Sequence, residues 1–397
     1  MACGSAPTQP AKDTGTLTSP VAHHTLSPAV KQYYANAIEP LYESLLVRRG
    51  FNGSILLAKN GEIVFEDYRG MINFKTKEPI TSNSVFHVAS VSKTFTAMVV
   101  LKLMEEGKIS LDDPVEKYLP GFPYPNIHIR ELLNHRSGLP KYDHFMSGTT
   151  TVAVKVRNKK GRLITRYRTV KTPLPIKGYV TNEDVLQYMI KYRPAPEASP
   201  NRRYIYCNTN FAMLALIIEK ITGTPFPEYM QQTVFQPLGM THTYVFSIKD
   251  TASYIPSYTP SRRPYGLEKL DCVYGDKNVY TNVRDLLLWD KALYDGKFVS
   301  QHSLDLAYTP YSNEKPGVKN YGLGWHLLVN PSEPVIPYHN GWWHGNNAVF
   351  KRLVSDTATV IILGNKFNSN IWTAGKISSV FTGRPDTTLL DDSGGGD

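Results

Sequence analysis

The stretch Ser90, Val91, Ser92 and Lys93 sets a hydroxyl and an amine three residues apart, immediately before an apolar run. From residue 92 to 106 the apolar residues recur close to a 3.6-residue period, and Gly107 follows as a stop signal, so this run predicts a buried helix. Positions i and i+3 share a helix face, which lets the Lys93 amine reach the Ser90 oxygen. Because burial lowers the pKa of an amine, the pair predicts an activated serine nucleophile.

A structural interpretation of Ser90 competes with the catalytic one. Serine is a common N-cap residue, so Ser90 also fits the start of a helix without any chemistry. The same spacing recurs at Ser312 and Lys315, but these residues lie beside Pro316 and Gly317 without apolar periodicity, which predicts a loop. The four residues alone leave both interpretations of Ser90 open.

Two later motifs favour the catalytic interpretation. Tyr206-x-Asn208 precedes an apolar helical run, and His339-x-Gly341 follows a strand-like run. With Ser-x-x-Lys, Tyr-x-Asn and His-x-Gly in this order, the chain resembles the serine β-lactamase-related hydrolases, a family that includes class C β-lactamases, DD-peptidases and esterases. The resemblance extends from about residue 33 to 382, and it includes longer matches to the family's connecting segments at residues 107–120, 129–140 and 283–300.

The resemblance implies a role for each matching residue. Ser90 attacks a carbonyl carbon, while Lys93 and Tyr206 share the proton transfers. The backbone N–H groups of Ser90 and Trp342 form the oxyanion hole. Asn208 orients Lys93 and the substrate. The residues implied in substrate binding are Asn208, His339, Asn340, Gly341 and Trp342.

Departures from the family pattern bear on the substrate. Class C β-lactamases carry Lys-Thr-Gly and then a hydroxyl residue at the third motif, and these groups receive a substrate carboxylate. Here Asn340 and Trp342 replace both hydroxyl residues. We therefore expect a serine hydrolase that acts as an esterase, amidase or peptidase. A β-lactamase or DD-carboxypeptidase is the alternative, and a non-catalytic, penicillin-sensor-like binding module is a second alternative.

No cofactor is expected. His339 and His344 lie five residues apart around two tryptophans, which is a poor spacing for a metal on a strand, so no metal site is predicted. The predicted partner is a small-molecule or peptide acyl substrate. The sequence does not predict the oligomeric state.

The predicted fold is α+β, with an antiparallel sheet flanked by terminal helices and an inserted all-helical lobe. A composition of 41% hydrophobic and 20% charged residues in 397 allows a large core, so residues 30–383 are expected to form one hydrolase domain. The helical lobe is expected over about 84–294, and residues 384–397 are expected to be a disordered tail. The sheet is expected to combine strands over 54–59, 63–68, 321–329, 335–339, 347–354 and 357–363, with helices over 30–49 and 371–381.

The net charge of +10 is concentrated in one segment. No acidic residue occurs from 144 to 182, while the alternating pattern around a turn predicts a basic β-hairpin, inserted at about 150–178. Such a hairpin attracts anionic substrates or an acidic envelope surface, or it is a solvated edge protected by charge. No nucleic-acid-binding signature accompanies it, so no nucleic-acid partner is expected.

The first 29 residues predict a flexible linker, because they are rich in Ala, Pro, Thr and Ser without periodicity. Ala2 and Cys3, followed by small residues, resemble what remains of a lipobox after cleavage. Cys3 is therefore a candidate lipid anchor of a periplasmic lipoprotein, against the alternative of an accidental cysteine. No window approaches 18 uninterrupted apolar residues, so no spanning helix is predicted.

Overall fold

The structure is a computed structural model, and it describes residues 25–159, 161–171, 174–331 and 333–383. The predicted lipid anchor at Cys3, residues 1–24 of the linker predicted over 1–29, and the tail over 384–397 lie outside the described residues. Among the described residues, no helix combines the length and the apolar character that crossing a bilayer requires.

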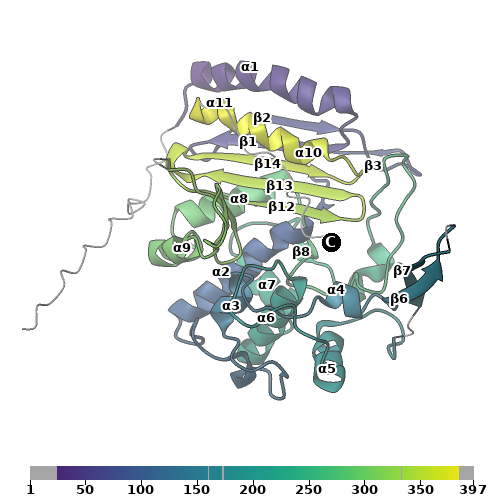
Figure 1. Cartoon of the computed structure of the whole chain (residues 1–397). Coiled ribbons are helices and arrows are strands. Elements are labelled where there is room, and N and C mark those ends of the chain that lie inside the picture. Colours follow the sequence, from purple (N-terminus) through teal and green to yellow (C-terminus); the bar gives the residue numbers. More distant parts are fainter. Residues whose placement is uncertain (1–24, 160, 172–173, 332, 384–397) are drawn as a thin grey trace, which may run out of the picture.

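A seven-stranded antiparallel sheet forms one half of the molecule (Figure 1). Strand β1 (Gly53–Lys59) pairs with β14 (Ala358–Gly364), so strands from both ends of the chain lie side by side, as predicted. Along β1, Ile55 and Leu57 face one hydrophobic cluster and Leu56 faces another, so both faces of the sheet are buried. The other strands are β2 (Glu62–Arg69), β10 (Lys319–Tyr321), β11 (His326–Leu328), β12 (Ile336–Trp343) and β13 (Asn346–Leu353), in the order β10-β11-β12-β13-β14-β1-β2.

The terminal helices cover one face of this sheet, as predicted (Figure 1). Helix α1 (Pro28–Leu45) begins after Ser27, whose hydroxyl accepts a hydrogen bond from the Val30 N–H, and a 3-10 turn follows it over Val47–Arg49. The C-terminal segment is not one continuous helix, because a 3-10 turn separates its two short helices. These are α10 (Asn370–Ala374) and α11 (Ser379–Thr382), with the turn at Gly375–Ser378 between them.

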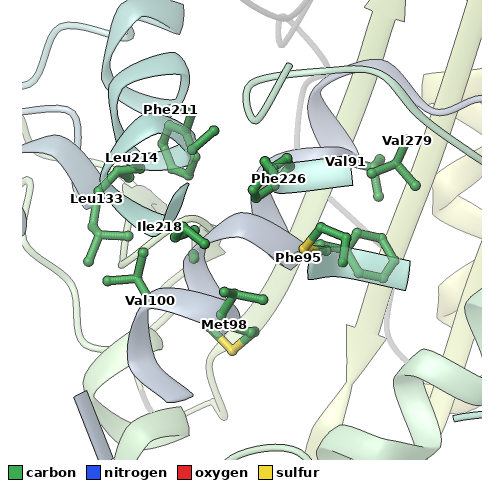
Figure 2. Close-up of a cluster of buried hydrophobic side chains, with 14 of the residues drawn as sticks. Val91, Phe95, Met98, Val100, Leu133, Phe211, Leu214, Ile218, Phe226 and Val279 are labelled. Atoms are coloured by element: carbon green, nitrogen blue, oxygen red, sulfur yellow. The ribbon is translucent and has the colours of Figure 1, made fainter. Parts of the chain in front are cut away.

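The opposite face packs against α8 (Val283–Tyr294) and the helical lobe (Figure 1). Two long helices cross at the centre of this lobe, α2 (Ser92–Glu105) and α6 (Asn208–Thr222). Figure 2 shows Phe95 and Met98 of α2 in one buried cluster with Phe211 and Ile218 of α6. The other helices are α3 (Ile129–Leu133), α4 (Tyr142–Phe145), α5 (Asn182–Tyr192), α7 (Phe226–Met230) and α9 (Gln301–Ala307).

Short strands also occur outside the main sheet. Strand β6 (Thr149–Arg157) pairs with β7 (Leu163–Lys171) in a two-stranded hairpin that projects away from the main sheet (Figure 1). A three-stranded sheet of β5 (Phe86–His87), β9 (Val279–Thr281) and β8 (Tyr244–Val245) leads into the start of α2. Strands β3 (Met71–Asn73) and β4 (Glu78–Pro79) form a further pair.

The prediction of one strand over residues 321–329 is wrong, because β10 and β11 form a hairpin there. Glycines account for the turn. A Cβ on Gly322 would lie 1.9 Å from the backbone oxygen of Ala307. Gly324 has φ +80°, and a Cβ there would lie 2.3 Å from Ala97 Cβ on α2. The turn therefore packs directly on the helix that carries Lys93.

Candidate active site

Ser90 lies in a tight backbone turn at the meeting point of the sheet and the helical lobe. A 3-10 turn over Ala89–Val91 connects β5 to α2, and Ser90 is partly buried within it. The preceding residue, Ala89, is held at φ +47°, in the left-handed region that a residue with a Cβ rarely adopts. Strained residues of this kind cluster at functional sites, where the surrounding structure holds them in place.

The predicted pair of Ser90 and Lys93 is in contact. The Lys93 amine lies on the first turn of α2 and donates hydrogen bonds to Ser90 Oγ at 3.0 Å and to the backbone oxygen of Asp276 at 2.8 Å. The Lys93 side chain is fully buried. Burial is the largest influence on the pKa of Lys93 and lowers it to about 7, although the nearby Asp276 carboxylate raises it. Near neutral pH, a large share of Lys93 is therefore neutral and able to accept a proton.

Tyr206 approaches Lys93 through its ring. It precedes α6, and the Lys93 ammonium lies over the ring face, 4.9 Å from the centroid. His135 lies on the ring with a centroid distance of 4.2 Å. Burial lowers the pKa of His135 well below its usual range, and the Lys93 charge adds to this effect, so the imidazole is neutral. The structure thus brings Tyr206 to the Ser90–Lys93 pair and adds His135 as its support.

His339 is fully buried beside Tyr206. Its Nε2 lies 3.3 Å from the Tyr321 hydroxyl, and its Nδ1 lies 2.7 Å from the Asn340 backbone oxygen. Burial lowers the pKa of His339 well below its usual range. The described residues that line the cavity at Ser90 include neither His339 nor Asn340. Their direct contact with substrate therefore stays a prediction, and the position of His339 suits support of the Tyr206 ring.

Gly341 and Trp342 lie on β12, where the strand passes the Ser90 turn. A Cβ on Gly341 would lie 2.2 Å from the backbone oxygen of Val88, so only glycine lets the strand approach this closely. Trp342 lines the same cavity as Ser90. Strand β12 therefore lies in close contact with the turn that carries Ser90.

The cavity at Ser90 has a volume of about 340 Å³, which suits a small-molecule site. We call it the active-site cavity. Asn208, at the first position of α6, also lines it, as do the aromatic residues Trp342 and Trp343. Among the described residues, no group of three His, Cys, Asp or Glu side chains is placed to hold a metal ion.

Four charged residues of the cavity were not predicted: Asp143, Glu268, Asp276 and Lys277. The Tyr142 hydroxyl donates to Asp276 Oδ2 at 2.8 Å. Lys277 donates to the Tyr142 hydroxyl and to the backbone oxygen of Val273, at 2.5 and 3.1 Å. These residues lie in short or irregular segments without apolar periodicity, so no pattern in the sequence marks them.

Comparisons with known proteins agree with this geometry. The chain matches the beta-lactamase family over residues 41–370. Penicillin-binding protein 4* of Bacillus subtilis (strain 168) is 30% identical, over 85% of this chain and 73% of that protein. Teichoic acid D-alanine hydrolase of Staphylococcus aureus is 26% identical, over 86% of this chain and 77% of that protein. The solved structure of an octameric penicillin-binding protein homologue from Pyrococcus abyssi superposes with a TM-score of 0.71 at 24% identity, over 88% of this chain and 78% of that chain.

Proposed function

The chain belongs to the beta-lactamase family of serine hydrolases, and we propose that it cleaves esters, amides or peptides through an acyl-enzyme formed on Ser90. One observation carries the proposal. Lys93 Nζ lies 3.0 Å from Ser90 Oγ, and burial lowers the Lys93 pKa to about 7. A neutral amine at this distance takes the hydroxyl proton as the oxygen attacks.

The proposed reaction has two halves. Ser90 Oγ bonds to the carbonyl carbon, its proton passes to Lys93, and the N–H groups of Ser90 and Trp342 stabilise the oxyanion. The leaving group then departs with a proton that Lys93 and Tyr206 deliver. In the second half, water gives up a proton to the same groups and attacks the acyl carbon, which releases the acid and restores Ser90.

Esters and amides are favoured over β-lactams because the cavity offers no available cation for a substrate carboxylate. Lys277 is the only lysine or arginine among the described residues that line the cavity. Its ammonium already donates to Tyr142 and Val273 and lies 3.8 Å from an Asp276 carboxylate oxygen. We also propose an extracytoplasmic location, since the relatives named above are a penicillin-binding protein and a teichoic acid hydrolase.

The proposal is tested with p-nitrophenyl acetate, nitrocefin and a fluorescent penicillin. Wild-type protein is expected to hydrolyse the ester, and Ser90→Ala is expected to lower kcat/KM by at least about 10³-fold. The matched control is Ser312→Ala, which removes the hydroxyl of the second Ser-x-x-Lys spacing and keeps full activity. Wild-type protein that neither turns over nor becomes labelled by any of these probes overturns the proposal, and nitrocefin cleavage faster than ester cleavage assigns a β-lactamase instead.

A further inference from the structure

We propose that the active-site cavity recognises a protonated primary amine on the acyl group, so that aminoacyl esters and amides are the preferred substrates. The inference rests on the proposed function, since it concerns which acyl groups reach Ser90. The ammonium is received by the side-chain oxygens of Asp143, Asp276 and Asn208, three residues that line the cavity with Ser90.

Three oxygens of these residues are buried without a hydrogen-bond donor. Within the described part of the chain, no group donates to Asp143 Oδ1, Asn208 Oδ1 or Asp276 Oδ1. Asp276 is only 1% exposed, and its other oxygen is already occupied by the Tyr142 hydroxyl. A buried carboxylate oxygen without a donor costs free energy of folding. Such a cost, repeated three times within one cavity, points to donors that the substrate supplies.

A protonated amine matches this set better than a neutral group does. The three oxygens only accept hydrogen bonds, and a primary ammonium carries three N–H donors together with a positive charge. The charges of the residues that line the cavity also favour a cation. Although the chain has a net charge of +10, the cavity is lined by the carboxylates of Asp143, Glu268 and Asp276 against one lysine, Lys277. This lining attracts a cation and repels an anion.

Lys93 donates no hydrogen bond to the carboxylates of Asp143 and Asp276 in the described part of the chain. The Lys93 amine donates one hydrogen bond to the backbone oxygen of Asp276, at 2.8 Å, and another to Ser90 Oγ. Burial keeps the Lys93 pKa lowered even though Asp276 and Asp143 both raise it. Neither of these two hydrogen bonds of Lys93 therefore uses a carboxylate oxygen of the cavity.

The remaining wall of the cavity is aromatic, formed by Tyr265, Trp342 and Trp343. These rings suit the side chain or the leaving group of a small substrate, because they bury apolar surface without demanding a charge. A volume of about 340 Å³ has room for an aminoacyl group together with a leaving group.

The test compares two methyl esters of nearly identical shape. Alanine methyl ester, in both its D and L forms, carries an ammonium where isobutyric acid methyl ester carries a methyl group. Rates of methanol release are divided by the hydroxide-catalysed rates, which removes the difference in intrinsic reactivity. We expect kcat/KM of the wild-type protein to favour one or both alanine esters by about ten-fold or more, as a charge-assisted hydrogen bond provides.

Variants of Asp143 and Asp276 test whether these two residues cause the preference for the amine. Asp143→Asn and Asp276→Asn are expected to bring the ratio toward one. The matched control is Asp112→Asn, whose side chain is 77% exposed and pairs with Arg130 outside the cavity, and it keeps the wild-type ratio. A second measurement uses wild-type protein alone, so it remains informative if the variants fail to fold. Alaninamide is expected to inhibit p-nitrophenyl acetate hydrolysis with a Ki about ten-fold below that of isobutyramide.

The outcomes separate the two proposals. If Ser90-dependent hydrolysis of p-nitrophenyl acetate is present but the ester ratio and the two Ki values show no preference for the amine, the inference is overturned and the proposed function stands. Hydrolysis of p-nitrophenyl acetate without hydrolysis of either methyl ester also overturns the inference. If the wild-type protein neither turns over nor becomes labelled by p-nitrophenyl acetate, nitrocefin or the fluorescent penicillin, the proposed function fails.

Discussion

The proposed role of Lys93 as a base depends on surroundings that penalise the charge of its amine. Full burial removes the water that would solvate the protonated amine. The hydrogen bonds to Ser90 Oγ and to the Asp276 backbone oxygen replace only part of that solvation. An exposed lysine has a pKa above 10 and is almost entirely protonated at neutral pH. Lys93 therefore owes its chemistry to its place inside α2 and the core around it.

The dependence of activity on pH follows from this lysine. With a pKa of about 7, the protonated fraction of Lys93 grows below pH 7, and kcat/KM for p-nitrophenyl acetate is expected to fall about ten-fold per unit at the acidic end. Above pH 8 the profile is expected to level, since the amine is then neutral. Lys93→Arg keeps the charge at every pH and is expected to lose at least about 10³-fold in kcat/KM. An ascending limb centred near pH 10 would contradict the assignment of Lys93 as the base.

Gly341 controls how closely β12 approaches the turn that carries Ser90. Gly341→Ala places a Cβ 2.2 Å from the Val88 backbone oxygen, so the strand must shift away from the Ser90 turn. We expect a loss of about 1–3 kcal/mol in the free energy of unfolding, measured with urea, together with slower acylation of Ser90. The control is Gly266→Ala, where an added Cβ meets no atom within 4 Å. Similar behaviour of both variants would show that the close approach is unimportant.

At the residue scale, the sequence alone was sufficient to predict the residues that belong to short motifs. Ser90, Lys93 and Tyr206, which were predicted from their motifs, lie together. The unpartnered carboxylate of Asp276 could not be predicted. Its importance comes from which neighbours fail to donate to it, and that depends on tertiary packing rather than on spacing along the chain.

At the scale of elements, a buried ion pair fastens α8 to the sheet. Asp290 on α8 bonds to Arg352 on β13 and to Thr359 on β14, and both charged side chains are about 1% exposed. Asp290→Asn is expected to lower the free energy of unfolding by about 3–5 kcal/mol, because the Arg352 charge stays buried without its partner. Urea titration measures the loss.

The exposed pair of Asp112 and Arg130 provides the comparison for this prediction. Asp112→Asn is expected to cost less than about 1 kcal/mol, because water solvates either charge when the pair is lost. Equal costs for the two variants would contradict the argument that burial decides the contribution of the Asp290 pair.

Elements with strong periodicity were predictable, and elements set by tertiary contacts were not. Helix α2 and strands β1 and β14 lie within one residue of their predicted bounds, because apolar spacing alone defines them. The hairpin of β10 and β11 was predicted as a single strand. Its turn depends on the space that Gly322 and Gly324 leave for neighbouring segments, and this space is not visible in the sequence.

At the scale of the whole molecule, the basic hairpin of β6 and β7 is an appendage. Its strands pair with each other and not with the main sheet. Replacing residues 149–173 with a short Gly-Ser linker is expected to change the free energy of unfolding by less than about 1 kcal/mol. The variant is also expected to elute from a cation-exchange column at lower salt, since it lacks a cluster of basic residues. Loss of the folded state in thermal unfolding would show instead that the hairpin supports the core.

The pairing of β1 with β14 affects how the newly made polypeptide behaves. One edge of β1 pairs with a strand that the ribosome adds about 300 residues later. The β1–β14 pairing therefore cannot form before residue 364 has been synthesised, and until then the nascent chain carries an open, aggregation-prone edge. This delay gives a chaperone or a secretion channel time to engage the polypeptide before it becomes compact.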